Sequence, residues 1–95
     1  KAVYHNLLII AGQQMAILKF YTNSCEPCAL LTNILAKGGI ETTNIDAKAN
    51  TDLVAEHGIR TVPTLVDTRT GQKLVGLKSI IEINAWIKQC YQIES

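Results

Sequence analysis

Apolar residues recur along this chain at two spacings, one typical of amphipathic helices and one typical of buried strands. Residues 3–14 place apolar side chains at helical spacing, which predicts a short helix that ends near a glycine. The continuous apolar run 16–21 predicts a buried strand, and the leucines and isoleucine of 26–37 predict an amphipathic helix. In chain order we predict helix 3–14, strand 16–21, helix 26–37, strand 40–45, helix 52–57, strands 64–67 and 73–75, and helix 79–93.

Turn and capping residues mark the ends of these elements. Gly38 and Gly58 directly follow two of the helices, and Thr51 is expected to cap the shorter one. Thr70 and Gly71 supply a tight turn that would join the last two strands as a hairpin. The side chains expected to face the core are Leu30, Leu31, Ile34 and Leu35 on the helix 26–37 and, on the last helix, Ile80 or Ile81, Ala85 or Ile83, Trp86 and Ile87.

This order of elements predicts an α/β fold, with a central mixed sheet of about four strands and helices on both faces. The chain has 95 residues, 47% of them hydrophobic and 18% charged, which is an ordinary globular composition and not that of a disordered chain. A chain of this length suits one hydrophobic core, so we expect residues 1–95 to form a single domain.

Charge and hydropathy exclude two classes of partner. The formal net charge is +1 and the nine basic residues are scattered, so the basic patch that nucleic-acid binding needs is not predicted. The apolar run 7–11 is too short to cross a membrane or to form the core of a signal peptide. Because the chain begins at Lys1 and not at Met, its native N-terminus is uncertain. We expect a cytoplasmic location, with export left open through a signal peptide that has been removed.

The cysteine count narrows the chemistry further. Three cysteines are too few for a secreted scaffold held together by disulfides. A structural zinc site usually takes four Cys or His ligands, and His5 and His57 lack that spacing, so we expect no metal. His57 is interpreted as a surface or capping residue. Cys90 is interpreted as a small buried apolar residue, with a regulatory or dimerising thiol as the alternative.

The motif Cys25-Glu26-Pro27-Cys28 carries the main functional prediction, because it lies between a predicted strand and a predicted helix. Two thiols three residues apart at a helix start share one face and can form a disulfide. Unpaired N–H groups and the positive end of the helix dipole favour a thiolate at the first cysteine, and the thiolate is the nucleophile. Pro27 suits the first turn and stiffens the motif. The sequence therefore predicts dithiol–disulfide exchange, with a metal-binding or purely structural pair as the alternative.

Over nearly its whole length the chain resembles the thioredoxin family. Three stretches carry the resemblance: the apolar strand leading into the Cys25–Cys28 motif, the segment from Asn44 through His57-Gly58-Ile59-Arg60-Thr61-Val62-Pro63-Thr64-Leu65, and Thr70-Gly71-Gln72-Lys73 with Val75-Gly76 before the last helix. The resemblance implies the thioredoxin fold and protein disulfide reduction.

The resemblance also implies roles for individual residues. It makes Cys25 the attacking thiol, Cys28 the resolving thiol and Pro63 a cis-proline beside them. It further implies that the backbone of Val62 pairs with an extended substrate segment and that Gly76 borders the substrate groove. A proline before a strand can also simply start that strand in the trans form, but the resemblance favours a cis bond.

Four positions depart from the family's pattern. Ser24 stands where thioredoxins usually have Trp, and Glu26 stands where they have Gly. Lys19 and Thr42 replace a buried Asp and the Lys that faces it. Near the sulfurs, Lys19 would stabilise a thiolate, and with a depressed pKa it could act as a base. The alternative is an apolar stem whose amine reaches water.

Glu26 acts in two directions. An acidic side chain in the first helical turn stabilises the helix, whereas the same charge beside Cys25 opposes its thiolate. The net effect on the thiol is left open. The predicted catalytic set is Cys25, Cys28, Pro27 and Pro63 with Lys19 as an electrostatic modulator, and the predicted substrate-binding set is Val62, Gly76, Ser24 and Glu26.

The predicted protein is a disulfide reductase that acts on disulfide-containing protein substrates as a monomer. It needs no metal or organic cofactor of its own and takes electrons from a separate enzyme that resembles thioredoxin reductase. One alternative is a glutaredoxin-like protein or a dedicated electron donor, for example to ribonucleotide reductase. The region 75–79 has one glycine and no acid where glutaredoxins bind glutathione, which disfavours glutathione binding. A second alternative is a peptide-binding module without catalysis.

Overall fold

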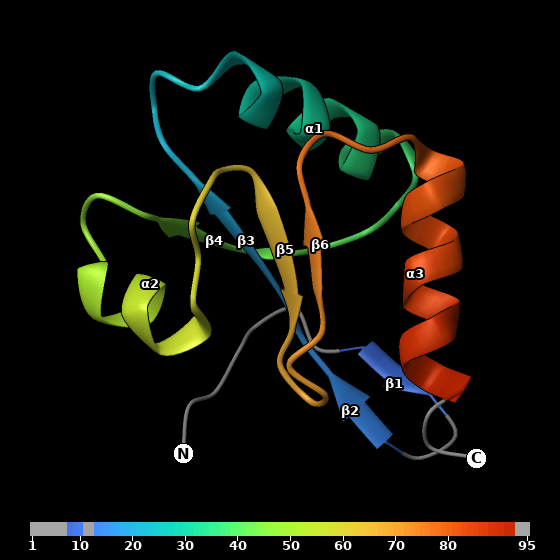
Figure 1. Ribbon diagram of the computed structural model, residues 1–95. Helices are drawn as coiled ribbons and strands as arrows, with labels where there is room; N and C mark the ends of the chain where they lie inside the picture. Colours follow the sequence, from blue (N-terminus) through green and yellow to red (C-terminus); the bar gives the residue numbers. More distant parts are fainter. Residues whose placement is uncertain (1–7, 11–12, 93–95) are drawn as a thin grey trace.

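The computed structural model describes residues 8–10 and 13–92. Its elements are β1 Leu8–Ile10, β2 Gln13–Met15, β3 Ile17–Tyr21, α1 Glu26–Lys37, β4 Thr43–Asp46, α2 Thr51–His57, β5 Thr64–Asp67, β6 Lys73–Val75 and α3 Ile80–Gln92. A four-stranded mixed sheet has the order β4-β3-β5-β6, and β1 and β2 form a separate antiparallel pair. Figure 1 shows helices on both faces of the larger sheet. The predicted α/β fold is confirmed.

The central strand β3 divides the core into two clusters, because successive side chains of a strand point to opposite faces. Ile17 joins the cluster under α1 and α3, whereas Leu18 and Phe20 join the cluster on the side of α2. β3 pairs in parallel with β4 and antiparallel with β5. The alternation places Lys19 on the same face as Ile17, beneath α1.

Several local predictions are confirmed. The helix α1 begins and ends where the apolar stripe and the following glycine indicate. Gly58 ends α2 in the left-handed conformation with φ of 64°, which glycine adopts without strain. Gly71, with φ of 79°, lies in the turn between β5 and β6, and its N–H bonds the carbonyl of Asp67 at 2.7 Å. Both glycines therefore lie where the backbone needs a positive φ.

The predicted helix 3–14 is wrong where the structure describes it. Leu8 pairs with Met15 and Ile10 with Gln13 in the antiparallel ladder of β1 and β2. A short apolar run rich in isoleucine fits a strand as well as a helix, and pairing with a neighbour satisfies its backbone. Residues 3–7 and the predicted end near Gly12 lie outside the described residues.

Two other boundaries need correction. Strand β4 starts at Thr43 and not at residue 40, because the N–H of Ile40 bonds the carbonyl of Leu35 and closes the end of α1. Thr51 is the first residue of α2 and not its cap. The cap position belongs to Asn50, whose side-chain amide bonds the Asp46 carbonyl at 2.9 Å.

The helix faces also differ in part from the prediction. On α1, Leu30 is 48% exposed while Leu31 and Leu35 are buried. On α3, Ile81 is 77% exposed and Ala85 is exposed, Ile80 is half-buried, and the predictions for Trp86 and Ile87 are confirmed. Over residues 80–90 of α3, whose side chains the structure describes, the buried residues are Ile83, Trp86, Ile87 and Cys90. Their spacing defines one stripe that covers the β-sheet.

Among residues 8–10 and 13–92, no helix is both long and apolar enough to traverse a lipid bilayer.

Candidate active site

The strand-to-helix junction after β3 builds the core of the site. Cys25 is the N-cap of α1, with extended backbone at φ −97° and ψ 107°, and its N–H bonds the carbonyl of Thr22 at 3.3 Å. Its Sγ accepts a hydrogen bond from the N–H of Cys28 at 3.1 Å. Pro27 lies in the first turn of α1, where backbone N–H groups have no partner within the helix, so the missing N–H of proline costs no hydrogen bond. A sulfur at this position meets the positive end of the helix dipole.

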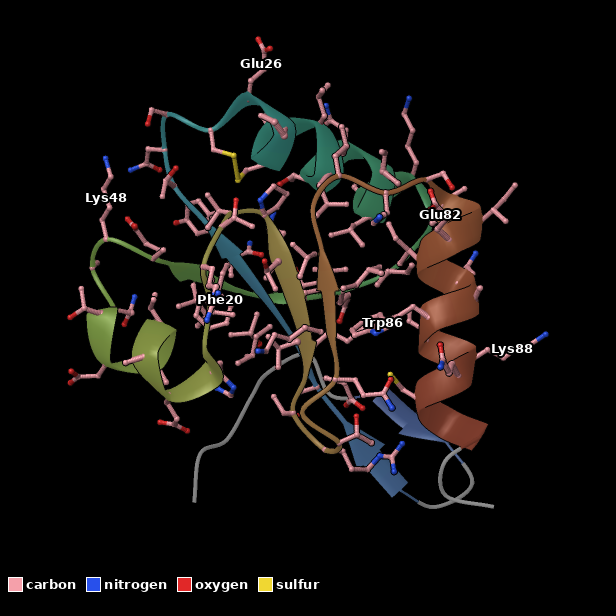
Figure 2. The ribbon with its side chains drawn as sticks, viewed as in Figure 1. Phe20, Glu26, Lys48, Glu82, Trp86 and Lys88 are labelled. Carbon is pink, nitrogen blue, oxygen red and sulfur yellow. A yellow bond between two sulfur atoms is a disulfide. The ribbon has the colours of Figure 1, made fainter. Side chains whose placement is uncertain are left out.

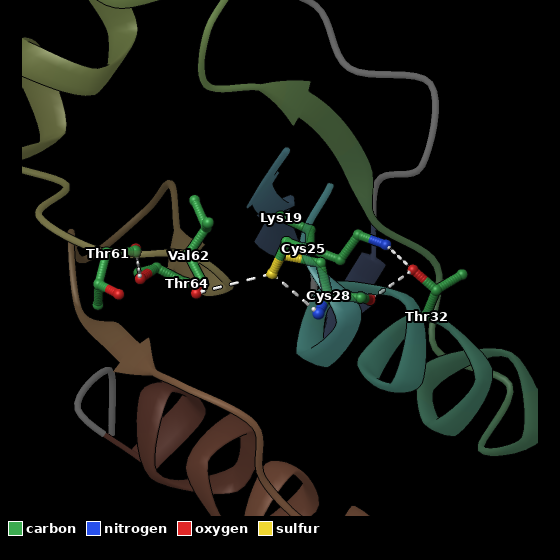
Figure 3. Close-up of a disulfide and its surroundings, with 7 residues drawn as sticks. All are labelled: Lys19, Cys25, Cys28, Thr32, Thr61, Val62 and Thr64. Atoms are coloured by element: carbon green, nitrogen blue, oxygen red, sulfur yellow. Dashed lines mark hydrogen bonds between the residues drawn. A yellow bond between two sulfur atoms is a disulfide. The ribbon is translucent and has the colours of Figure 1, made fainter. Parts of the chain in front are cut away.

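Cys25 and Cys28 are joined by a disulfide with a Cα–Cα distance of 5.2 Å (Figure 3). Cys28 is 3% exposed, whereas Cys25 is only half-buried. A hollow of about 190 Å³ opens over the pair, lined by Tyr21, Thr22, Asn23, Cys25, Cys28, Ala29 and Thr32. An incoming thiol or disulfide therefore has better access to Cys25 than to Cys28.

The loop before β5 lies against the disulfide. The Val62–Pro63 peptide bond is cis, as predicted, and the carbonyl oxygen of Val62 is 3.9 Å from Sγ of Cys25. Gly76, with φ of 91°, donates its N–H to the carbonyl of Pro63 at 2.8 Å. The structure thus brings the loop of Val62 and Pro63, with Gly76 bonded to it, against Cys25, from which all three are distant in the sequence.

The other two predicted binding residues lie at the rim. Ser24 and Glu26 are exposed, and Figure 2 shows the Glu26 side chain pointing away from the fold. Neither contributes to the packing beneath the disulfide. Their predicted role in substrate binding stays a prediction.

Lys19 lies beneath the site and is 4% exposed, so its amine does not extend into bulk water as one interpretation required. Its ammonium group donates a hydrogen bond to Oγ1 of Thr32 on α1, as Figure 3 shows. Burial lowers the pKa of Lys19, because the charged form loses hydration. Thr42 does not face Lys19 across the ladder between β3 and β4, because the register partner of Lys19 is Asn44. The Thr42 hydroxyl instead donates a hydrogen bond to the Asn44 side chain at 2.8 Å.

Thr32 is the site residue that the sequence reasoning missed. Its hydroxyl accepts from Lys19 and donates to the carbonyl of Cys28 at 3.0 Å. The signal was present in the spacing, because residues four apart on a helix lie on one face and Thr32 follows Cys28 by four positions. The hydroxyl of a threonine at this spacing can donate a hydrogen bond to the carbonyl one turn earlier in the helix.

The remaining candidates lie elsewhere. The His57 ring packs edge-on against Phe20 at 5.8 Å on the α2 side of the sheet. Cys90 is fully buried, and burial, with Asp67 nearby, raises its pKa to about 11. Within the described parts of the chain, no three His, Cys, Asp or Glu side chains gather in a way that could hold a metal ion.

Comparison with known proteins gives consistent relatives. A family model described as Thioredoxin matches residues 2–89. Thioredoxin of Rickettsia felis is 26% identical over 90 residues, which cover 85% of this chain and 86% of that one. Mitochondrial thioredoxin of Mus musculus is also 26% identical over 90 residues and 85% of this chain, but the match covers 54% of its length. The chain thus spans about half the length of the mitochondrial relatives that it matches.

Solved structures agree with the sequence matches. A mutant thioredoxin from Halobacterium salinarum superposes with a TM-score of 0.70 at 27% identity, covering 79% of this chain and 73% of that one. Thioredoxin f2 of Chlamydomonas reinhardtii superposes with a TM-score of 0.65 at 25% identity, covering 79% and 77%.

Proposed function

The chain belongs to the thioredoxin family, and we propose that it is a thiol–disulfide oxidoreductase that reduces protein disulfides through Cys25 and Cys28. The observation that carries the proposal is the arrangement of this pair. A half-buried Cys25 caps α1 and is joined to a buried Cys28 beside the cis-Pro63 loop. The more accessible of the two cysteines is therefore the one at the helix terminus, where a thiolate is stabilised.

In the first step, the Cys25 thiolate attacks one sulfur of a substrate disulfide. The substrate S–S bond breaks, a mixed disulfide forms, and the departing substrate thiolate takes a proton from solvent. In the second step, Cys28 loses its proton and attacks the Cys25 sulfur. The mixed disulfide breaks, the second substrate thiol is released, and the Cys25–Cys28 disulfide forms. Two electrons pass from the dithiol to the substrate.

The substrate segment is proposed to lie in extended form along the loop before β5. The backbone of Val62 is the proposed pairing partner, because its carbonyl oxygen is 3.9 Å from the Cys25 sulfur. Gly76 is proposed to border the same substrate segment, because its N–H bonds the Pro63 carbonyl at 2.8 Å. Backbone pairing of this kind tolerates many side chains, so it suits a reductase that acts on several disulfide-containing proteins.

The dithiol is itself the redox group in this proposal, so no metal or organic cofactor is assigned to residues 1–95, which we treat as one domain. Electrons must come from an external donor, and we propose an enzyme like thioredoxin reductase. A monomer in a reducing compartment is proposed, with the cytoplasm as the first choice; some relatives are named mitochondrial thioredoxins. Such compartments keep cysteine thiols reduced.

Reduction of insulin disulfides with dithiothreitol as the electron source tests the proposal. The native chain should accelerate precipitation of the insulin chains well above the rate with dithiothreitol alone, and Cys25→Ser should return that rate to background. A folded native chain without activity would contradict the reductase assignment and favour a binding module. Reduction of the disulfide by glutathione alone, at a rate comparable to that with dithiothreitol, would favour a glutaredoxin-like protein instead.

A further inference from the structure

A buried cation lies one hydrogen-bonded residue away from the redox pair. Among the described residues, the buried charged side chains are Lys19, at 4% exposure, and Asp67, at 0%. The carboxylate of Asp67 is bound within its own turn by the N–H of Arg69 at 3.1 Å and the hydroxyl of Thr70 at 2.6 Å. Lys19, in contrast, has no carboxylate within ion-pair distance in the described part of the chain.

The surroundings of the Lys19 amine connect it to the disulfide. Thr32 lines the hollow over Cys25 and Cys28, and it also lines a second hollow of about 280 Å³ that contains Lys19. The ammonium donates to Thr32, whose hydroxyl donates to the Cys28 carbonyl at 3.0 Å. Thr32 is therefore the link between the buried charge and the first turn of α1, which contains Cys28 and is capped by Cys25.

The other groups around the amine do not neutralise it. On β3, the ring centroid of Tyr21 is 5.9 Å from the Nζ atom, which favours a cation. From the neighbouring segment, Asn44 and Glu41 line the same hollow, and Glu41 is exposed and makes no ion pair with Lys19 among the described contacts. A buried cation without a close opposite charge would be stabilised by any negative charge that formed nearby.

We propose that Lys19 is a positioning residue of the redox site: acting through Thr32, its charge favours the thiolate of the reduced Cys25–Cys28 pair and makes the disulfide easier to reduce. The inference rests on the proposed function and extends it by assigning the residue that sets the balance between dithiol and disulfide. The two sulfurs are neutral in the disulfide, whereas reduction creates a thiolate that attracts the cation. The reduced form alone gains this attraction, so the reduction potential becomes less negative.

The equilibrium with dithiothreitol measures this balance. One dithiothreitol molecule gives up two electrons and two protons and becomes its cyclic disulfide, while the Cys25–Cys28 bond breaks. One proton stays on Cys28 as a thiol. The other either stays on Cys25 or goes to solvent and leaves the thiolate that Lys19 is proposed to favour. The ratio of oxidised to reduced protein at a known ratio of the two dithiothreitol forms gives the equilibrium constant.

The main variant is Lys19→Met, which keeps an apolar stem of similar length and removes the charge. At a pH above the Cys25 thiol pKa of both proteins, its equilibrium constant for reduction should fall about tenfold, which corresponds to a potential about 30 mV more negative. In the reduced protein, the midpoint of the thiolate absorbance at 240 nm should move upward by about one pH unit. Lys19→Arg keeps the charge and should restore both readouts toward the native values.

Two further variants test the hydroxyl link and the effect of net charge separately. Thr32→Val removes the hydroxyl link at an exposed helix position, so it should fold, and it should shift the equilibrium about threefold in the same direction. Lys88→Met removes the same net charge at an exposed position of α3, where Figure 2 shows the side chain directed away from the fold, and it should change nothing. Circular dichroism and thermal melts confirm that each variant is folded.

The outcomes separate this inference from the proposed function. Folded Lys19→Met and Thr32→Val variants with the native equilibrium constant would overturn the role of Lys19, even if insulin reduction is intact. An equal shift in Lys88→Met would overturn it too, because the effect would then reflect net charge alone. A native chain that does not reduce insulin, although its disulfide equilibrates with dithiothreitol, would instead overturn the reductase function and leave the role of Lys19 standing.

Discussion

The orientation of α3 yields the prediction that depends most directly on the packing of this fold. Ile83 is 0% exposed and lies in the cluster with Leu31, Leu35 and Trp86, whereas Ile81 on the same helix is 77% exposed. The two residues have the same side chain and are two positions apart. Truncating each to alanine therefore compares a buried with an exposed isoleucine at nearly constant helix propensity.

The expected magnitude follows from the burial. Removing a fully buried isoleucine side chain to alanine costs about 2–5 kcal/mol, and the middle of that range is about 3.5 kcal/mol. A domain of this length is stable by about 5–14 kcal/mol in total, so Ile83→Ala should remain folded at low temperature but lose a large fraction of its stability. The melting temperature should fall by roughly 15–25 °C. Ile81→Ala should change stability by less than about 0.5 kcal/mol.

Urea unfolding of the oxidised variants, followed by far-UV circular dichroism, measures both values. The slopes of the two unfolding curves should match that of the native chain, so that the midpoints report stability alone. Equal losses in Ile81→Ala and Ile83→Ala, or a larger loss in Ile81→Ala, would refute the assigned face of α3.

Three further predictions follow from local features. Gly58→Ala should cost about 1–2 kcal/mol in urea unfolding, because φ of 64° is strained for a side chain that has a Cβ; an unchanged midpoint would contradict the left-handed cap. Cys90, with a pKa of about 11, should have roughly one thiolate per thousand thiols at pH 8. In the reduced native protein, iodoacetamide should therefore label Cys25 far faster than Cys90. Similar labelling rates by mass spectrometry would contradict the burial of Cys90. The N–H of Ser79 bonds the Glu82 carboxylate at 3.2 Å and lowers its pKa, so this carboxylate stabilises the fold above its unfolded pKa. That contribution is lost as the pH falls through the folded pKa, so Glu82→Gln should weaken the fall in stability between about pH 5 and pH 3. A pH profile identical to that of the native chain would contradict the capping contact.

The features that could be predicted from the sequence have strong local causes. The helix α1 was placed correctly because a cap, a proline in the first turn, an apolar stripe and a closing glycine all agree between Cys25 and Gly38. Gly58 and Gly71 likewise need backbone conformations that other residues avoid. The same local signals placed the two cysteines on one face, so the chemistry of the site could be predicted before its geometry.

The features that could not be predicted depend on distant contacts. Residues 8–10 form a strand because Met15 and its neighbours pair with them, and the apolar pattern alone does not distinguish that pairing from a helix. The spacing of apolar residues on α3 allows Ile80 or Ile81 to face the core as well as Ile83. In the structure, Ile83 and Trp86 are the residues that pack in the core cluster. Thr32 was missed because its importance comes from Lys19, thirteen residues earlier on another element.

A trapping experiment with Cys28→Ser tests whether Cys25 is the attacking thiol and Cys28 the resolving thiol. Without the resolving thiol, the reduced variant should attack a protein disulfide once and stop at the mixed disulfide. We expect non-reducing electrophoresis to show a covalent complex that dithiothreitol cleaves by reduction. Peptide mapping should place the linkage at Cys25. No complex with a folded variant, or a linkage at Cys90, would contradict the account.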